Sequence, residues 1–349
     1  MNLKDLKKAH YESVELLVSD IPRREIALGV NIRAQCFNKP KDLAKVLAAR
    51  SNVEGAFAST AYYLDPHIKA HTKKGHLGTD LIFDVDAKPE SDRLNWLYDV
   101  CFRTSQLVDI LVHELGFKKE EMILDFSGNK GFHITIDNPE YKSLSKVDRT
   151  QLIHYITGEK VKRTDLAFGK GGWNKRFTSY LHNLASLMKN HSIDNPNVNT
   201  KTLESLGLPK TTAKKLGDLM KQPTKRELLP KGRLGFLDAR SIASLQSHFF
   251  NQQKQGLQLV DKVCTTDMYR IFRIPGTIHP KTGFVSTRLH IDDVDNPAAI
   301  IDKVKRAGGL TMTAIDLKKE ATEDFDQVKV WPAGTHEVPR WLALHLLHQ

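Results

Sequence analysis

The sequence predicts an α+β fold in which mixed or antiparallel β-sheets are flanked by helices and interrupted by an inserted helical subdomain. Short β-prone segments and a hairpin pattern occupy much of the first 137 residues. The apolar period becomes helical from about residue 145 to residue 250, and β-prone segments return between 268 and 290. We therefore expect three parts: the first part of a core over 1–150, a helical insertion over 151–250, and the second part of the core with a C-terminal helix over 251–349.

The individual elements follow from apolar periodicity and from the Gly, Pro and capping residues along the chain. In the first part we expect a helix over 1–20, a strand over 24–37, helices over 43–49 and 91–115, strands over 55–64 and 79–87, and a hairpin of strands 122–126 and 132–137. Prolines at 209, 223 and 230 indicate short helices within the insertion. In the last part we expect strands over 268–274 and 284–290, a helix over 297–307 and an amphipathic helix over 338–349.

Composition indicates a globular protein with a polyanionic partner. The 349 residues are 40% hydrophobic, and a net charge of +11 favours nucleic acid or nucleotide phosphates as ligands. The three scattered cysteines predict neither a disulfide framework nor a Cys-rich zinc site, and they fit a reducing cytosol. Because the sequence shows no signal-peptide pattern and no long apolar run, we expect a cytoplasmic protein that is neither secreted nor membrane-spanning.

Two aspartates end an apolar segment. TDLIFDVDA (79–87) carries Asp84 and Asp86, separated by one valine. In an extended strand these carboxylates point the same way, and like charges that close repel unless a cation lies between them. Carboxylate oxygens suit Mg²⁺ or Mn²⁺, so the pair predicts a metal site. The alternative is that one aspartate caps the next helix and the other makes a surface ion pair.

The turn of the predicted hairpin contains groups that bind phosphate. The segment 127–133, SGNKGFH, supplies the Ser127 hydroxyl, the Lys130 ammonium and the His133 imidazole, and its glycines let backbone N–H groups approach a ligand. Strand alternation places His133 on the face opposite Phe132 and Ile134. An ordinary hairpin with a lysine in its turn would show the same pattern.

A third cluster of polar residues follows the helical insertion. Asp261 or Asp267 could complete a carboxylate triad with the first pair, and Arg273 and His279 could hold phosphate oxygens. Arg270 and Arg273 do not share a strand face, so at most one of them need point toward a site. The alternative for this segment is a surface hairpin with basic residues.

Taken together and in this order, the clusters resemble the catalytic small subunit of archaeal and eukaryotic-type DNA primase. The resemblance covers nearly the whole chain outside the helical middle. It rests on an Arg-Glu and Arg-x-x-x-Phe element in RREIALGVNIRAQCF, a Ser-x-x-Tyr-Tyr element in STAYYLDP, the metal strand TDLIFDVDA, the nucleotide motif SGNKGFHITI and the basic loop RIPGTIHPKTG. The combination is very specific.

The resemblance implies template-directed synthesis of short primers on single-stranded DNA. It implies two Mg²⁺ or Mn²⁺ ions, nucleoside triphosphate substrates and a primase large subunit as partner in a hetero-oligomer. Among the matching positions, Asp261 fits the third carboxylate better than Asp267 does. The implied metal-binding and catalytic residues are Asp84, Asp86 and Asp261, and the implied nucleotide-binding residues are Ser127, Lys130, His133, Arg273, His279, Glu25 and Arg33.

This sequence departs from the family pattern at two places. Asn129 stands where the family often has arginine, which would weaken a phosphate contact or leave it to Lys130 alone. Many relatives carry a Cys/His zinc knuckle between the metal strand and the hairpin, but here only Cys101 and His113 are candidate ligands. Two ligands do not close a tetrahedral site, so we expect no structural zinc.

Two alternative functions remain open from the sequence. A related primase-polymerase, or the polymerase module of an end-joining ligase, shares the D-x-D and S-G-x-K-G-x-H motifs, although the basic loop and N-terminal motifs favour the primase subunit. A non-catalytic nucleic-acid-binding scaffold with the same fold is the other alternative.

The role of the helical insertion also remains open, between a template-binding surface and a solvated cover. Residues 201–233 contain nine basic residues and three acidic ones. Within them, LESLGLPKTTAKKL (203–216) resembles a helix-hairpin-helix binder of the DNA backbone but lacks its second glycine.

Overall fold

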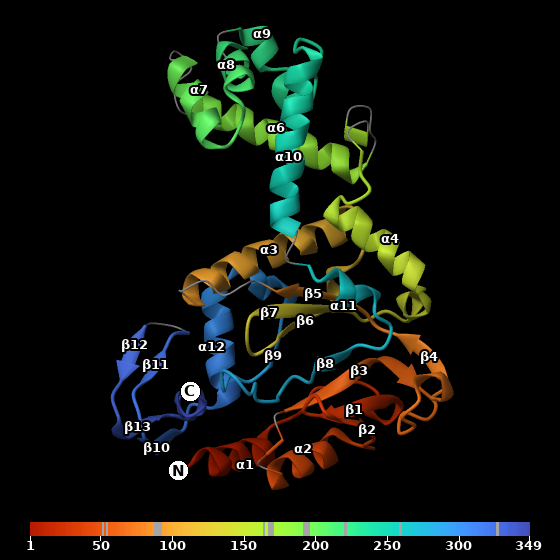
Figure 1. Ribbon diagram of the computed structural model, residues 1–349, viewed down its shortest axis with the longest axis vertical. Coiled ribbons are helices and arrows are strands. Elements are labelled where there is room, and N and C mark those ends of the chain that lie inside the picture. Colours follow the sequence, from red (N-terminus) through yellow and green to blue (C-terminus); the bar gives the residue numbers. More distant parts are fainter. Residues whose placement is uncertain are drawn as a thin grey trace. The chain divides into compact units, whose positions relative to one another are not determined.

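An inserted helical segment divides this chain into two units, each with its own core (Figure 1). The sheet unit comprises Met1–Val112, Gly116–Ile153 and Leu259–Gln349, and the helical unit comprises His113–Leu115 and His154–Gln258. The computed structural model describes residues 1–349 except 51, 54, 87–92, 163–164, 167–170, 191–195, 220–221, 258–259 and 326–327. Antiparallel sheets and many helices confirm the predicted α+β class.

The first sheet of the sheet unit, here the N-terminal sheet, has strand β3 at its centre. Its order is β2-β1-β3-β4, and β8 also pairs with β3, at Phe57–Ser59, next to the stretch of β3 that pairs with β4. All pairings are antiparallel. The strands are β1 (Arg24–Leu28), β2 (Ile32–Gln35), β3 (Ala56–Tyr63), β4 (His76–Thr79) and β8 (Ile271–Arg273).

The second sheet, here the aspartate sheet, is antiparallel with the order β5-β7-β6-β9. Its β5–β7 register pairs Asp84 with His133 and Asp86 with Gly131. The opposite face packs into a core that includes Phe83 and Phe132, both fully buried. The predicted alternation of polar and packed faces is therefore confirmed. The strands are β5 (Leu81–Asp86), β6 (Met122–Phe126), β7 (Gly131–Ile136) and β9 (Thr287–Leu289).

Helices and two short β-ribbons complete the sheet unit (Figure 1). Helix α1 packs on α2, and α12 packs on α13. The helices are α1 (Leu3–Ser13), α2 (Pro40–Ala49), α3 (Arg93–His113), α11 (Lys262–Thr266), α12 (Pro297–Gly308) and α13 (Arg340–Leu346). The ribbons pair β10 (Met312–Leu317) with β13 (Gly334–Pro339) and β11 (Ala321–Glu323) with β12 (Lys329–Trp331).

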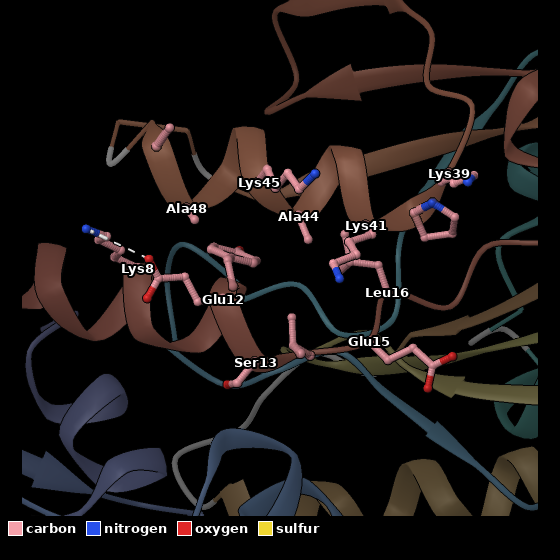
Figure 2. A pocket seen from close by; sticks show the side chains of 14 residues that line it. Lys8, Glu12, Ser13, Glu15, Leu16, Lys39, Lys41, Ala44, Lys45 and Ala48 are labelled. Carbon is pink, nitrogen blue, oxygen red and sulfur yellow. Dashed lines mark ion pairs between the residues drawn. The ribbon is translucent and has the colours of Figure 1, made fainter.

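A cavity of about 940 Å³ lies alongside α1 and α2. Figure 2 shows Ala44 and Ala48 of α2 lining it, with Lys8 and Glu12 of α1 on the facing helix. Small alanine side chains leave this space between the helices, and lysines surround it. It shares no lining residue with a second, smaller cavity, which Asp84 and Asp86 line.

The helical unit is held by an aromatic core. Trp173, Phe177 and Phe249 are buried in it, together with leucines from several helices. Glu114 and Arg176 form a nearly buried ion pair at 2.6 Å. The helices are α4 (Lys146–Thr157, which begins in the sheet unit), α6 (Gly172–Asn190), α7 (Pro196–Ser205), α8 (Lys210–Leu219), α9 (Pro223–Arg226) and α10 (Ala239–Leu257).

Several predicted elements differ from the structure. The expected strand over 24–37 is two strands, β1 and β2, because Gly29 adopts a φ of +60° and turns the chain. The expected helix over 1–20 ends at Ser13, and the strands expected over 268–274 and 284–290 shrink to three residues each. The ribbons within 312–339 were not predicted. The proposed start of α3 at residue 91 lies outside the described residues.

Among the helices that are described, none has the length and apolar character that crossing a bilayer requires.

Candidate active site

A cavity of about 190 Å³ is lined from both sheets of the sheet unit. The N-terminal sheet contributes side chains from β3 and β8, and the aspartate sheet contributes β5, β7 and the β6–β7 turn. Helix α11 and the loop after β8 add the rest. Residues that the sequence predicted and that line the cavity are Asp84, Asp86, Ser127, Lys130, His133, Arg273 and His279.

Asp84, Asp261 and Cys264 form a carboxylate–thiol cluster at this cavity. The Asp261 N–H donates to the Asp84 carbonyl oxygen at 2.8 Å, which holds the two residues side by side. Asp261 also caps α11, because its Oδ1 accepts from the N–H groups of Val263 and Cys264. The Cys264 sulfur lies 3.3 Å from Asp84 Oδ2 and 3.1 Å from Asp261 Oδ2. One donor atom from each of the three residues thus lies within 4.8 Å of the other two.

The electrostatics of the cluster disfavour two charged carboxylates without a cation. Burial raises the pKa of Asp84 from 3.8 to about 6, and Asp261 acts in the same direction. Burial and the charge of Asp84 also raise the pKa of Asp86. Burial acts to raise the pKa of Asp261, but hydrogen bonds from Cys264 and Val263 outweigh it and the pKa is lowered. Burial and Asp84 raise the pKa of the Cys264 thiol. A divalent cation bound between these carboxylates would offset both their mutual repulsion and the cost of burying their charges.

The β6–β7 turn brings Lys130 beside the second aspartate. Lys130 Nζ lies 2.6 Å from Asp86 Oδ2, and this hydrogen bond raises the pKa of the lysine. Ser127 Oγ accepts from the N–H groups of Asn129 at 3.4 Å and Gly131 at 3.3 Å. These hydrogen bonds are long and therefore weak.

His133 is a neutral side chain that lines the cavity. Its Nε2 lies 3.7 Å from Asp84 Oδ1, and its ring meets that of Phe272 edge-on with centroids 4.6 Å apart. Burial lowers the pKa of His133 to about 4. At pH 7 the imidazole therefore offers one N–H donor rather than a positive charge.

The loop after β8 supplies further basic groups. The His279 N–H donates to the Phe284 carbonyl oxygen at 2.8 Å, which closes the loop over the Lys-Thr-Gly turn. Arg273 donates to the Ile278 carbonyl oxygen at 3.3 Å and covers the Phe57 ring at 4.5 Å. Arg270 also lines the cavity, so the expectation that only one arginine need face it was wrong. Arg270 precedes β8, where strand alternation does not apply.

Glu25 and Arg33 form a separate cluster on the N-terminal sheet. Arg33 Nε donates to Glu25 Oε1 at 2.7 Å, and the fully buried Lys74 donates to Glu25 Oε2. The Lys74 ammonium also lies 4.9 Å from the centre of the Tyr63 ring. None of these described residues lines the cavity that contains Asp84. A nucleotide-binding role for Glu25 and Arg33 stays a prediction.

Replacing Lys74 by methionine is expected to lower the free energy of unfolding by about 3 kcal/mol. Removing one partner of a buried ion pair typically costs about 3–5 kcal/mol, and Arg33 still compensates part of the Glu25 charge. Urea unfolding followed by circular dichroism measures the change. The neighbouring Lys73 is exposed, so Lys73→Met is the matched control and should change stability by less than about 0.5 kcal/mol. Equal effects of the two variants would contradict this assignment.

The carboxylate–thiol cluster fits a divalent metal. Asp84 Oδ1 is buried and has no hydrogen-bond partner among the described residues, although a charged oxygen in such a place needs a donor or a cation. Asp84 and Asp261 present the oxygen donors that Mg²⁺ and Mn²⁺ prefer. Asp86 faces the same cavity through the strand alternation but is paired with Lys130.

Sequence reasoning missed Cys264 at this site, and it considered Arg270 without assigning it a role. The signal for Cys264 was present, since it lies three residues after Asp261, the spacing at which a capping residue meets the first helical turn. A short helix at 262–266 was not expected from the sequence, and this spacing was therefore not used.

Comparison with known proteins identifies the family. The family model for the DNA primase small subunit matches residues 83–291. The chain belongs to the DNA primase small subunit family. It is 26% identical to the DNA primase small subunit PriS of Methanosarcina barkeri, over 99% of this chain and 94% of that protein. It is 28% identical to PriS of Picrophilus torridus, over 97% of this chain and 93% of that protein.

Membership of the primase small subunit family indicates the class of reaction that the chain belongs to. The family places the chain among the nucleotidyltransferases of DNA replication, which are in general metal-dependent, and the acidic cluster is a group of residues able to hold a metal. The matched region contains every cavity-lining residue that the sequence predicted. Glu25 and Arg33 precede it.

Proposed function

We propose that this chain is a primase catalytic subunit that joins nucleoside triphosphates into short primers on single-stranded DNA, with Mg²⁺ or Mn²⁺ at the site. The observation that carries the proposal is the position of the carboxylate–thiol cluster. The buried Asp84 oxygen, which accepts no hydrogen bond from the described residues, lies at the same small cavity as Lys130, Arg270 and Arg273. Acidic and basic groups around one space fit a metal-bound triphosphate.

We assign metal binding to Asp84, Asp86 and Asp261. The bound ions would supply Lewis acidity that favours ionisation of a primer 3′-hydroxyl and stabilises the leaving pyrophosphate. A backbone hydrogen bond holds Asp84 beside Asp261, and the α11 cap fixes Asp261, so their backbones already place the two carboxylates close together. Asp86 would exchange its Lys130 partner for the metal.

The remaining side chains would bind the triphosphate. Lys130, released from Asp86, and the guanidinium groups of Arg270 and Arg273 would neutralise phosphate oxygens. His133 would donate a neutral hydrogen bond, because its pKa lies well below 7. Ser127, the N–H groups of the turn and His279, which lines the same cavity, would complete the phosphate contacts. Positioning and electrostatics supply most of the rate in such reactions.

We further propose a primase large subunit as partner and a cytoplasmic location. The name of the relatives, small subunit, is the support for the partner. The net charge of +11 supports binding to the template backbone without sequence readout, and such binding should weaken steeply as salt increases.

Primer synthesis on a single-stranded template is the test of this function. The purified chain, with and without a large subunit, is incubated with ribo- or deoxyribonucleoside triphosphates and Mg²⁺ or Mn²⁺. We expect templated products that disappear when a chelator removes the metal and return when metal is added in excess. Heat-treated protein in the same buffer is the control for contaminating polymerases.

Two outcomes would contradict the proposal. A preference for a gapped duplex with a 5′-phosphate over a bare template would indicate an end-joining polymerase module instead. Absence of both primer synthesis and metal-dependent nucleotide binding, measured by calorimetry, would indicate a non-catalytic scaffold.

A further inference from the structure

Cys264 adds a thiol to the carboxylate–thiol cluster. A metal site built from carboxylates alone would not need this thiol. The Cys264 side chain is buried, and its sulfur lies 3.3 Å from Asp84 Oδ2 and 3.1 Å from Asp261 Oδ2. A single S–H proton therefore serves two carboxylate oxygens. The thiol is directed between them by the first turn of α11, whose cap is Asp261 itself.

The spacing of these donor atoms is close to that of a coordination sphere. With metal–sulfur and metal–oxygen bonds of about 2.3 Å and about 2.0 Å at a tetrahedral angle, sulfur and oxygen ligands lie roughly 3.5 Å apart. The two sulfur–oxygen distances fall only a few tenths of an ångström short of this value. Small side-chain rotations would therefore bring the three donors to one ion.

We propose that Cys264 is a further ligand of this site, so that Asp84, Asp261 and Cys264 also bind thiophilic divalent ions such as Zn²⁺ or Co²⁺, which would compete there with the Mg²⁺ or Mn²⁺ of the proposed reaction. On binding, a lone pair of the sulfur forms the bond to the metal and the S–H proton passes to solvent. Sulfur binds Zn²⁺ and Co²⁺ well and Mg²⁺ poorly, so the thiolate adds affinity for one class of ion only. The inference deepens the proposed function and rests on it for the location of the metal.

Cobalt spectroscopy tests the proposal directly, because a Co²⁺–thiolate bond gives a charge-transfer band in the near ultraviolet that carboxylate ligands do not give. The metal-free full-length chain is titrated with Co²⁺. We expect the band to appear with the wild-type chain at one equivalent. In Cys264→Ser we expect the band to be lost and Co²⁺ affinity to fall by about 10–100-fold, the range that even outer-shell changes produce at metal sites. Mg²⁺ affinity should change far less.

The other two cysteines provide matched controls. Cys36 is exposed and Cys101 is buried away from the cluster, so the double variant Cys36→Ser, Cys101→Ser keeps Cys264 as the only cysteine. The band should persist in that variant, which identifies the ligand even where Cys264→Ser does not fold. Co²⁺ binding to the wild type without the band, or loss of the band in the double variant, would overturn the inference. Either result leaves primer synthesis by the wild type intact, whereas failure of primer synthesis would remove the proposed function instead.

Discussion

Asp84→Asn is expected to give a protein that is inactive in primer synthesis and yet more stable than the wild type without metal. The activity should fall by at least about a hundredfold, because loss of even an outer-shell partner of a metal costs about 10–100-fold and Asp84 is assigned a direct ligand role. At pH 7.5 in chelator, stability should rise by on the order of 2–3 kcal/mol, since two pKa units correspond to about 2.7 kcal/mol.

The sign of the stability change follows from the raised pKa of Asp84. The folded protein holds this proton up to about pH 6, whereas the ordinary value is 3.8. Between these values the folded state binds more protons than the unfolded state, so stability falls as pH rises through this window. Asparagine does not ionise, so the variant does not lose the stability that the wild type loses when Asp84 becomes charged. Near pH 3.5 the Asp84 carboxylic acid is also neutral, and the difference between the two proteins should nearly vanish.

Thermal unfolding in chelator at pH 3.5, 5 and 7.5 measures this difference. Excess Mg²⁺ or Mn²⁺ at pH 7.5 should stabilise the wild type and leave Asp84→Asn unchanged, since only the wild type presents the full donor set. Asp302→Asn is the matched control, because Asp302 is exposed and forms an ion pair with Arg306 one turn further along α12. An Asp84→Asn variant that loses stability at pH 7.5 would show that the carboxylate is not strained in the metal-free protein.

How far the site could be predicted depends on whether its parts are local in sequence. Asp84, Asp86 and His133 obey strand alternation, and the register that pairs Asp84 with His133 places them where the pattern indicated. Asp261 was selected through a family resemblance, and the backbone hydrogen bond to Asp84 that brings it there joins residues 177 positions apart in the sequence. No local pattern encodes such a contact.

Cys264 and the β-ribbons show why the rest was missed. The position of Cys264 depends on a five-residue helix that is too short for a periodic signal. The ribbons β10–β13 and β11–β12 contain strands of only three to six residues, whose alternation is too brief to separate from loops. The nucleotide-binding role of Glu25 and Arg33 stays a prediction; in the structure Glu25 pairs with both Arg33 and Lys74.

Gly131→Ala is expected to be the most damaging single substitution in the β6–β7 hairpin. A Cβ at this position would lie 2.3 Å from the Val85 carbonyl oxygen and 2.3 Å from Asp86 Oδ1. Because the register pairs Gly131 with Asp86, the clash lies inside the β5–β7 ladder. The Val85 carbonyl oxygen belongs to the backbone, so it cannot move away by a side-chain rotation. Overpacking of this kind costs about 1–3 kcal/mol and occasionally more.

The same clash should reduce activity beyond the loss of stability. Separating β7 from the end of β5 displaces Asp86 and moves Lys130, which precedes Gly131, so both the metal site and the phosphate contacts lose their geometry. Primer synthesis measured well below the melting temperature, with metal titrated, should show a weaker metal dependence and a rate reduced by about a hundredfold. Gly235→Ala is the matched control, because a Cβ there meets nothing within 4 Å, and that variant should match the wild type or be slightly more stable. A Gly131→Ala protein with wild-type metal affinity and rate would mean that the close approach of β5 to β7 does not position the site.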